Sequence, residues 1–464
     1  MYVTRMLKQS SYISVPVTIW IFLILYKFHG RHVTQLSAET TQHRDSKLLS
    51  DKIWRKTSLK KTPLGIRKPN TRERSIELKN IDNDKSSKQY PTLNVEGHGR
   101  VQKDDPRLNV QLKQPVQNVF FLKTHKTASS TVQNIFMRYG DNRNLTFGLA
   151  KSGNLLGYPL NFKKDVLSPL TIGNEYNIIC HHLRYNRNIK QIMPENTKFI
   201  SIVRNPFHQF RSAFYYYLFQ SPMCYNIASN YSLKTFTEAT RRLKERICGV
   251  PTRNIMMYDF GMDFPDMNDE ALIQQKIQMI DEDFDLILIT DYLDESLILM
   301  KELLNWKIDD IVSFTKTYSA YNKSNIITQS MATSMVRWNY ADHLLFKHFN
   351  DSLWEKIDVY GRDRMNKQIS VLRNRRHQLE SFCIKNMSFI DEIENIDFKP
   401  TNRMDITLGY NLNVFAKGNR TCNQLATDEV PYTKKLGAKM KKLGRFSHRL
   451  GIRNTDDFHL NPKR

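Results

Sequence analysis

The sequence predicts an α/β domain, because short apolar runs of strand length lead directly into segments with helical periodicity. The first run is Val119–Leu122, and the apolar positions that recur at helical spacing begin just after Thr131. The second is Phe199–Arg204, followed by Pro206, a residue that suits the first turn of a helix. A third strand is expected at Tyr176–Cys180. The chain of 464 residues has room for two or three average domains, or for one large α/β domain with extensions.

The amino-terminal end predicts a membrane anchor. Residues 1–11 read as a cytoplasmic tail that carries Arg5 and Lys8, and an apolar run of about 15 residues begins at Tyr12. We place a transmembrane signal-anchor at 12–28, because the run is near the lower limit for thin membranes and no small-residue cleavage site follows it. A short tail that stays in the cytoplasm predicts a single-pass type II protein with a lumenal domain. A cleaved signal peptide is the alternative.

The rest of the chain divides by composition into three parts. Residues 29–115 are polar, poor in aromatic residues and free of cysteine, so they are expected to form a flexible stem. The lumenal domain is expected over 116–430. The segment 431–464 is rich in lysine and arginine and carries three glycines within 437–451, which predicts a basic, disordered tail.

The loop after the first strand, Lys-Thr-Ala-Ser-Ser-Thr at 126–131, is suited to bind a phosphate or sulfate group. A helix N-terminus presents unpaired N–H groups and a partial positive charge, and Lys126 adds a point charge just before it. Ser129 and Ser130 are suitable N-cap residues. An NTPase loop is excluded, because its glycines are missing and the first glycine of this segment is Gly140. The alternative is an ordinary strand–loop–helix with a solvated lysine.

Two further pairs of residues point to anion binding and to proton transfer. Arg204 ends its strand and Ser212 lies two turns into the next helix, so together they are placed to grip a phosphate from two sides. His181 and His182 follow the third strand, at the sheet edge where α/β proteins bind ligands. A neutral imidazole suits the role of general base for a sugar hydroxyl. No third ligand lies at recognisable spacing, so a zinc site is not predicted.

Charge and cysteine usage limit the partners and the compartment. The net charge of +24 favours polyanionic partners without choosing among them. None of the five cysteines forms a Cys-x-x-Cys pair; we predict the pairs Cys224–Cys248 and Cys383–Cys422, with Cys180 buried on a strand. Six N-glycosylation sequons all follow the stem, which suits a lumenal domain: Asn144, Asn230, Asn322, Asn350, Asn386 and Asn419.

Three stretches together resemble the galactose 3-O-sulfotransferase family: LKTHKTASST (122–131), ICHHLRYNR (179–187) and FISIVRNPFHQFRSAF (199–214). The resemblance extends over about residues 116–400. It implies a P-loop-like sulfotransferase fold with a central parallel sheet flanked by helices, a short anchor, a stem and a Golgi lumenal domain. It also implies the sulfate donor 3′-phosphoadenosine 5′-phosphosulfate and no metal.

The resemblance also implies roles for individual residues. Lys126, with the backbone N–H groups of the loop, is expected to hold the 5′-phosphosulfate, while Arg204 and Ser212 hold the 3′-phosphate. His182 is expected to act as the base, with His181 as the fallback, since adjacent strand residues face opposite sides. The loop residues concerned are Thr127, Ala128, Ser129, Ser130 and Thr131. Lys123 and His125 are expected in supporting roles.

The resulting hypothesis is a Golgi membrane enzyme that sulfates the 3-hydroxyl of galactose on a glycolipid or glycoprotein glycan. No nucleic-acid partner is expected, and a homodimer is left open. One alternative is a uronyl 2-O-sulfotransferase-like enzyme acting on a glycosaminoglycan. A nucleotide-binding kinase is disfavoured by the missing glycines and by the lack of a carboxylate for magnesium. The last alternative is a non-catalytic, membrane-anchored glycan-binding protein.

Overall fold

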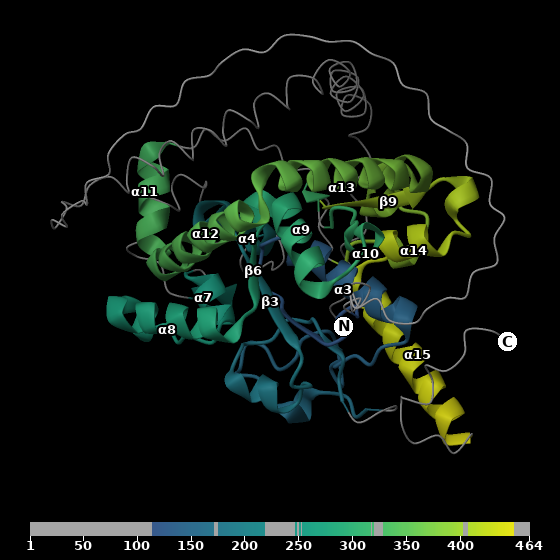
Figure 1. Ribbon diagram of the computed structural model, residues 1–464, viewed down its shortest axis with the longest axis horizontal. Coiled ribbons are helices and arrows are strands. Elements are labelled where there is room, and N and C mark those ends of the chain that lie inside the picture. The colour runs from purple at the N-terminus through teal and green to yellow at the C-terminus, as the bar shows by residue number, and fades with distance from the viewer. Residues whose placement is uncertain are drawn as a thin grey trace, which may run out of the picture. The chain divides into compact units, whose positions relative to one another are not determined.

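The computed structural model describes residues 114–170, 175–218, 246–247, 250–251, 253–316, 318–319, 328–401 and 407–449 (Figure 1). The chain divides into two compact units, 1–105 and 106–464, and every described residue belongs to the second. The predicted cytoplasmic tail and anchor, nearly all of the predicted stem, Cys224 and Cys248 lie outside these ranges. Within them, no helix is both long and apolar enough to cross a bilayer.

A four-stranded parallel sheet forms the centre of the second unit, as predicted. Its order is β2 (Ile178–Ile179), β1 (Val119–Leu122), β3 (Lys198–Val203) and β6 (Leu286–Ile289). All residues of β1, β2 and β6 are buried, which is typical of a parallel sheet covered on both faces. The first strand has the predicted bounds, and the second is shifted by one residue. The third is shorter than expected, because only two of its residues pair with β1.

Helices cover the sheet, and their bounds follow the apolar periodicity of the sequence. Both α9 and α12 contact β6, and α13 packs against both of these helices; Figure 1 shows α13 above α9. Pro206 is the first residue of α4, as its position predicted. The helices before the last strands are α3 (Ser129–Arg143), α4 (Pro206–Leu218), α7 (Ile255–Asp259), α8 (Glu270–Asp283), α9 (Leu293–Leu304), α10 (Ile308–Ile311), α11 (Gln329–Trp338), α12 (Tyr340–Tyr360) and α13 (Arg362–Cys383). Short 3-10 turns occupy Lys164–Val166, Arg187–Gln191, Asp266–Asn268, Thr290–Tyr292, Ile390–Glu392, Ile396–Phe398 and Val414–Ala416.

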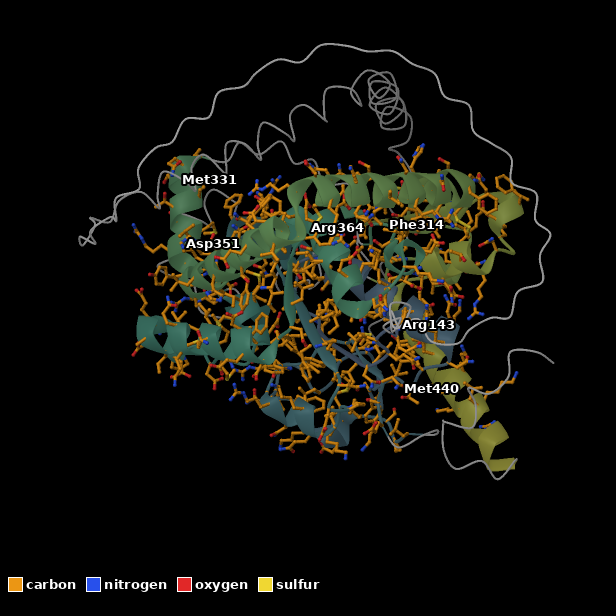
Figure 2. The ribbon with its side chains drawn as sticks, in the orientation of Figure 1. Arg143, Phe314, Met331, Asp351, Arg364 and Met440 are labelled. Atoms are coloured by element: carbon orange, nitrogen blue, oxygen red, sulfur yellow. A yellow bond between two sulfur atoms is a disulfide. The ribbon has the colours of Figure 1, made fainter. Side chains whose placement is uncertain are left out.

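A smaller antiparallel sheet combines one strand from before α11 with two strands that follow α13. Its order is β7 (Tyr318–Ser319), β9 (Thr407–Leu412) and β8 (Ile384–Phe389); β4 (Arg246–Ile247) and β5 (Val250–Pro251) form a separate pair. The predicted disulfide Cys383–Cys422 is confirmed, and it joins the end of α13 to α14 (Arg420–Ala426). Phe314 packs in the same apolar cluster as both cysteines, and Figure 2 shows it beside β9. Cys180 is buried and unpaired, also as predicted.

The basic segment near the carboxyl end is a helix, α15 (Glu429–Arg449), so the prediction of disorder is wrong for 431–449. Tyr432 and Leu436 are buried, and the Phe147 N–H donates to the Met440 sulfur at 3.2 Å. These apolar residues are four apart, so they form one stripe along the helix. Figure 2 shows Met440 on α15. This apolar stripe is the signal that predicts a docked helix. The many lysines of the segment conceal it.

Candidate active site

The loop between β1 and α3 has an unusual backbone. Lys126 and Ala128 both have positive φ, 63° and 60°, which is the left-handed region that glycine normally occupies. Each such residue costs about 1–2 kcal/mol, so surrounding contacts have to maintain the loop. Ala128 is the N-cap of α3, and it offers no side-chain cap. The expectation that Ser129 or Ser130 caps the helix is therefore wrong, because the left-handed turn starts the helix one residue earlier.

The side-chain hydroxyls of the loop hold it against the sheet. The Thr127 and Thr124 hydroxyls lie 2.8 Å apart, and the Ser129 hydroxyl donates to the Thr124 carbonyl at 2.6 Å. The Thr290 hydroxyl, from the segment after β6, donates to the Thr127 carbonyl at 2.6 Å. The Thr131 hydroxyl accepts from the Lys316 N–H at 3.0 Å. These hydroxyls are thus engaged within the protein, so ligand binding is left chiefly to the backbone N–H groups of the loop and to the Lys126 side chain.

The backbone N–H groups of Thr127, Ala128, Ser129 and Ser130 have no acceptor among the described residues. The N–H of Thr131, which was expected in the same set, instead donates to the Ala128 carbonyl at 3.0 Å. Successive N–H groups in such a turn, at the start of a helix, form a concave site for an anion. The loop therefore makes an anion site without glycine.

Replacing Ala128 by glycine is expected to raise the free energy of unfolding by about 1 kcal/mol, because glycine adopts positive φ without steric cost. Chemical denaturation of the wild type and the variant measures the difference. Gly153 has a positive φ of 69° and open space where a Cβ would lie, so Gly153→Ala is the matched reverse substitution and is expected to destabilise. A lower stability of the Ala128→Gly variant would mean that the loop is not strained.

Lys126 is a cation held in a positively charged environment. Its Nζ lies 3.3 Å from the centroid of the Tyr216 ring, and it forms no ion pair among the described residues. Burial lowers the pKa of Lys126 to about 7, and the nearby charges of Arg204 and Lys123 contribute to the shift. An anion bound to the loop would offset this repulsion. The electrostatics therefore favour a ligand with negative charge at this position.

The affinity for 3′-phosphoadenosine 5′-phosphosulfate, the donor that the family resemblance implies, is expected to fall as the pH rises above about 7. Below that pH Lys126 is already charged in the free protein, whereas above it each binding event must also take up a proton. The affinity then falls by up to about tenfold per pH unit. Calorimetric titration with the donor between pH 6.5 and 8.5 measures this. Because arginine stays charged, Lys126→Arg is the control that isolates the titration of the lysine from that of the donor. Parallel curves for the two proteins would contradict the prediction.

Arg204 lies at the end of β3 beside the loop, as the sequence predicted. Its Nη1 donates to the Lys126 carbonyl at 3.2 Å, while its buried Nε has no partner among the described residues. Burial lowers the pKa of this guanidinium, so a bound anion would be stabilising here. Ser212 lies on α4, and the structure records no contact between it and Arg204. Its pairing with Arg204 around a phosphate stays a prediction.

His182 lies on the loop side of the sheet edge. Its Nδ1 is 2.7 Å from the Lys123 carbonyl, to which it must donate, and its Nε2 is 3.0 Å from the Lys123 Nζ. The ring stacks on His125 at 4.0 Å between centroids. Burial lowers the pKa of His182 well below its usual value, and the charges of His125 and Lys123 add to the effect. The imidazole is therefore neutral near pH 7 with its lone pair on Nε2, the form that accepts a proton.

His181 faces α15 instead of the loop. Its Nε2 lies 2.8 Å from the hydroxyl of Thr433, which itself donates to the Glu429 carbonyl, so the His181 Nε2 is the donor. The side chain is only 1% exposed, and burial lowers its pKa to about 4. The two histidines thus lie on opposite sides, as expected for neighbours at a strand end.

Four further residues complete the site: His125 and Lys123, which sequence reasoning underrated, and Asp259 and Glu429, which it missed. The His125 Nδ1 lies 2.9 Å from a carboxylate oxygen of Asp259, which also accepts from the His125 N–H at 2.7 Å. Asp259 is fully buried at the end of α7 and orients this ring, so His125 is a second candidate base. Lys123 is buried between His182 and Glu429, whose Oε2 accepts from its Nζ at 2.6 Å. Asp259 and Glu429 carry no local motif, and only the fold brings them here.

These elements form a candidate site of an α/β protein, in which a loop suited to bind an anion lies at one strand end beside histidines at the next. Comparison with known proteins identifies the family. The chain belongs to the galactose-3-O-sulfotransferase family, whose profile matches residues 85–440, and it is a sulfotransferase. The match begins inside the predicted stem and ends inside α15.

Characterised relatives align over most of their length. Human (Homo sapiens) galactosylceramide sulfotransferase is 30% identical over 337 residues, which are 70% of this chain and 79% of the relative. Human galactose-3-O-sulfotransferase 2 is 32% identical over 357 residues, 74% of this chain and 88% of the relative. Mouse (Mus musculus) galactose-3-O-sulfotransferase 3 is 32% identical over 343 residues, 70% and 78% of the two chains.

Proposed function

We propose that this sulfotransferase transfers a sulfuryl group from 3′-phosphoadenosine 5′-phosphosulfate to the 3-hydroxyl of a galactose residue on a glycolipid or glycoprotein glycan. The observation that carries the proposal is the anion site of the loop. There the Lys126 ammonium and four backbone N–H groups come together, and none of them has an anionic or acceptor partner among the described residues. The names of the relatives support galactose or galactosylceramide as the acceptor.

The residues present fit this donor. Lys126 and the N–H groups of Thr127 through Ser130 would hold the 5′-phosphosulfate, and the buried Nε of Arg204, with Ser212, would hold the 3′-phosphate. The donor supplies an activated sulfuryl group whose leaving oxygen gains negative charge, by analogy with phosphoryl transfer. Lys126 and the helix N-terminus are suited to stabilise that charge. The Nε2 of His182, which carries the lone pair of the ring, would accept the proton of the attacking hydroxyl once the Lys123 Nζ has moved away from it.

One transfer assay tests the proposal. The full chain in detergent is given the donor with labelled sulfate and a panel of acceptors: galactosylceramide, N-glycans and O-glycans ending in β-galactose, and glycosaminoglycans containing uronic acid. Label is expected in the galactose acceptors, at the 3-hydroxyl. Label in uronic acid alone would favour the 2-O-sulfotransferase alternative. Absence of transfer to any acceptor, with donor binding intact, would favour a glycan-binding protein.

The cellular location is part of the same proposal. We propose that residues 12–28 anchor the chain in the Golgi membrane as a single-pass type II protein, with the stem 29–115 holding the lumenal domain away from the bilayer. The disulfide Cys383–Cys422 supports an oxidising compartment. Protease protection of the sulfotransferase domain in intact Golgi vesicles, and its loss after detergent, is the expected result. Size-exclusion chromatography with light scattering measures whether the protein forms a homodimer.

A further inference from the structure

Glu429 brings the carboxyl-terminal helix into the candidate active site. It is the first residue of α15, and its side chain is 15% exposed. Its Oε2 accepts from the Lys123 Nζ at 2.6 Å, and its Oε1 accepts from the side-chain amides of Gln133 and Asn154, each at 3.3 Å. Burial alone would raise the pKa of this carboxyl, but Lys123 and His181 hold it below its usual value. Glu429 is therefore a buried, charged carboxylate bound by three segments of the domain.

Lys123 binds both nitrogens of the same imidazole. Its carbonyl accepts from the His182 Nδ1 at 2.7 Å, and its Nζ lies 3.0 Å from the His182 Nε2. A charged lysine only donates, so its position at Nε2 requires the lone pair of the ring to be there. The tautomer of His182 therefore depends on Lys123, and the Nζ of Lys123 is held in place by its carboxylate partner.

We propose that Glu429 is a positioning residue of the active site, which holds the Lys123 ammonium against His182 and thereby keeps this imidazole neutral with its lone pair on Nε2. Through this contact, α15 takes part in the reaction, although Glu429 itself touches neither reacting group. The inference deepens the proposed function and rests on it. In the reaction the Lys123 Nζ has to leave Nε2 before the acceptor hydroxyl donates there, and its contact with Glu429 is the shorter of the two.

Several titratable groups lie close to the Lys123–Glu429 pair or to the His182 ring. Cys180 and His181 lie beside the Lys123–Glu429 pair, while His125 and Lys126 lie on the loop side. The charge of Lys123 opposes protonation of His182, and so do those of His125 and His181. Of these, only Lys123 is held in place by Glu429, so a change at Glu429 acts on His182 through Lys123.

The test is the acidic limb of the pH profile of kcat/KM, where protonation of the base stops the reaction. In Glu429→Gln, the Lys123 ammonium loses the carboxylate that holds it against His182 and is expected to leave Nε2. The acidic limb is expected to move to higher pH by about one unit, because a like charge near the ring has been removed. Glu429→Asp, which keeps the charge, is expected to leave the limb near its original position.

The matched control is Asp428→Asn, which changes the adjacent carboxylate, just before the start of α15. Asp428 accepts from the N–H of Thr401 at 3.0 Å and does not contact Lys123, so the limb is expected to stay in place. If Glu429→Gln lowered the rate by one factor at every pH, or moved the limb to lower pH, Glu429 would only dock the helix and the inference would be wrong.

Two further measurements keep the test decisive. If Glu429→Gln does not fold, the double variant Lys123→Met with Glu429→Gln removes both charges of the pair. This double variant is expected to fold and to show the same upward move of the acidic limb.

If the wild type transfers no sulfate, the proposed function fails separately. NMR titration of the His182 ring in the histidine-labelled full chain, assigned with His182→Asn, then reports the same shift without turnover. An unmoved His182 titration in both variants would overturn the inference.

Discussion

Replacing His182 by alanine is expected to lower the turnover of sulfate transfer by ~10²-fold or more, the usual loss for a general base. The reason is its geometry: the Nδ1 is bound to the Lys123 carbonyl at 2.7 Å, so the neutral ring carries its lone pair on Nε2. Steady-state kinetics with a galactose acceptor measures the loss. Donor affinity, measured by calorimetry, is expected to change little, because the anion site belongs to the loop and to Arg204.

Two neighbouring histidines serve as comparisons for this variant. His181→Ala is expected to lower stability more than turnover, because His181 is 1% exposed and contacts Thr433 on the far side. His125→Ala tests the Asp259-oriented ring. If His182→Ala retained near-normal turnover while one of the other two lost it, that residue would be the base and our assignment would be wrong.

Replacing Lys126 by alanine is expected to lower turnover by ~10²-fold or more, the range for removing a residue that stabilises a developing charge. Lys126 adds its positive charge to the N–H groups of the anion loop, and no described carboxylate neutralises it. Lys126→Arg keeps the charge but changes its shape, so it is expected to retain part of the turnover.

Measuring both kcat and the affinity for the donor separates binding from catalysis at Lys126. A loss in kcat as well as in donor affinity would mean that the lysine stabilises the transition state more than the bound donor. A change in KM alone, with kcat unaltered, would contradict the catalytic role and leave Lys126 as a binding residue only. Thermal unfolding of the same variant is expected to be unchanged or improved, since a partly desolvated cation has been removed.

The sequence was sufficient for those features that neighbouring residues determine. The apolar run Val119–Leu122 became β1 with the predicted bounds, and Pro206 opened α4. The loop residues and Arg204 came together because parallel strands place their carboxyl ends at one sheet edge. Opposite sides for His181 and His182 followed from strand geometry.

Features that depend on distant residues were not predictable from the sequence. Asp259 lies 134 positions beyond His125, and Glu429 lies 306 positions beyond Lys123. An isolated aspartate or glutamate gives no local signal, so only the folded chain identifies these partners. The left-handed Ala128 was equally hidden, because alanine disfavours that conformation and tertiary contacts impose it. For α15, the lysine-rich composition conceals the apolar spacing along the helix.

The contact between Lys123 and Glu429 also bears on the order in which the protein is made. Lys123 is synthesised early in the domain, whereas its carboxylate lies near the carboxyl end, after α14. Until that helix has been translated and docked, the lysine next to His182 lacks this counter-charge. This contact therefore waits for the end of the domain, and a chain that stops before residue 429 contains the whole anion loop but lacks the carboxylate partner of Lys123.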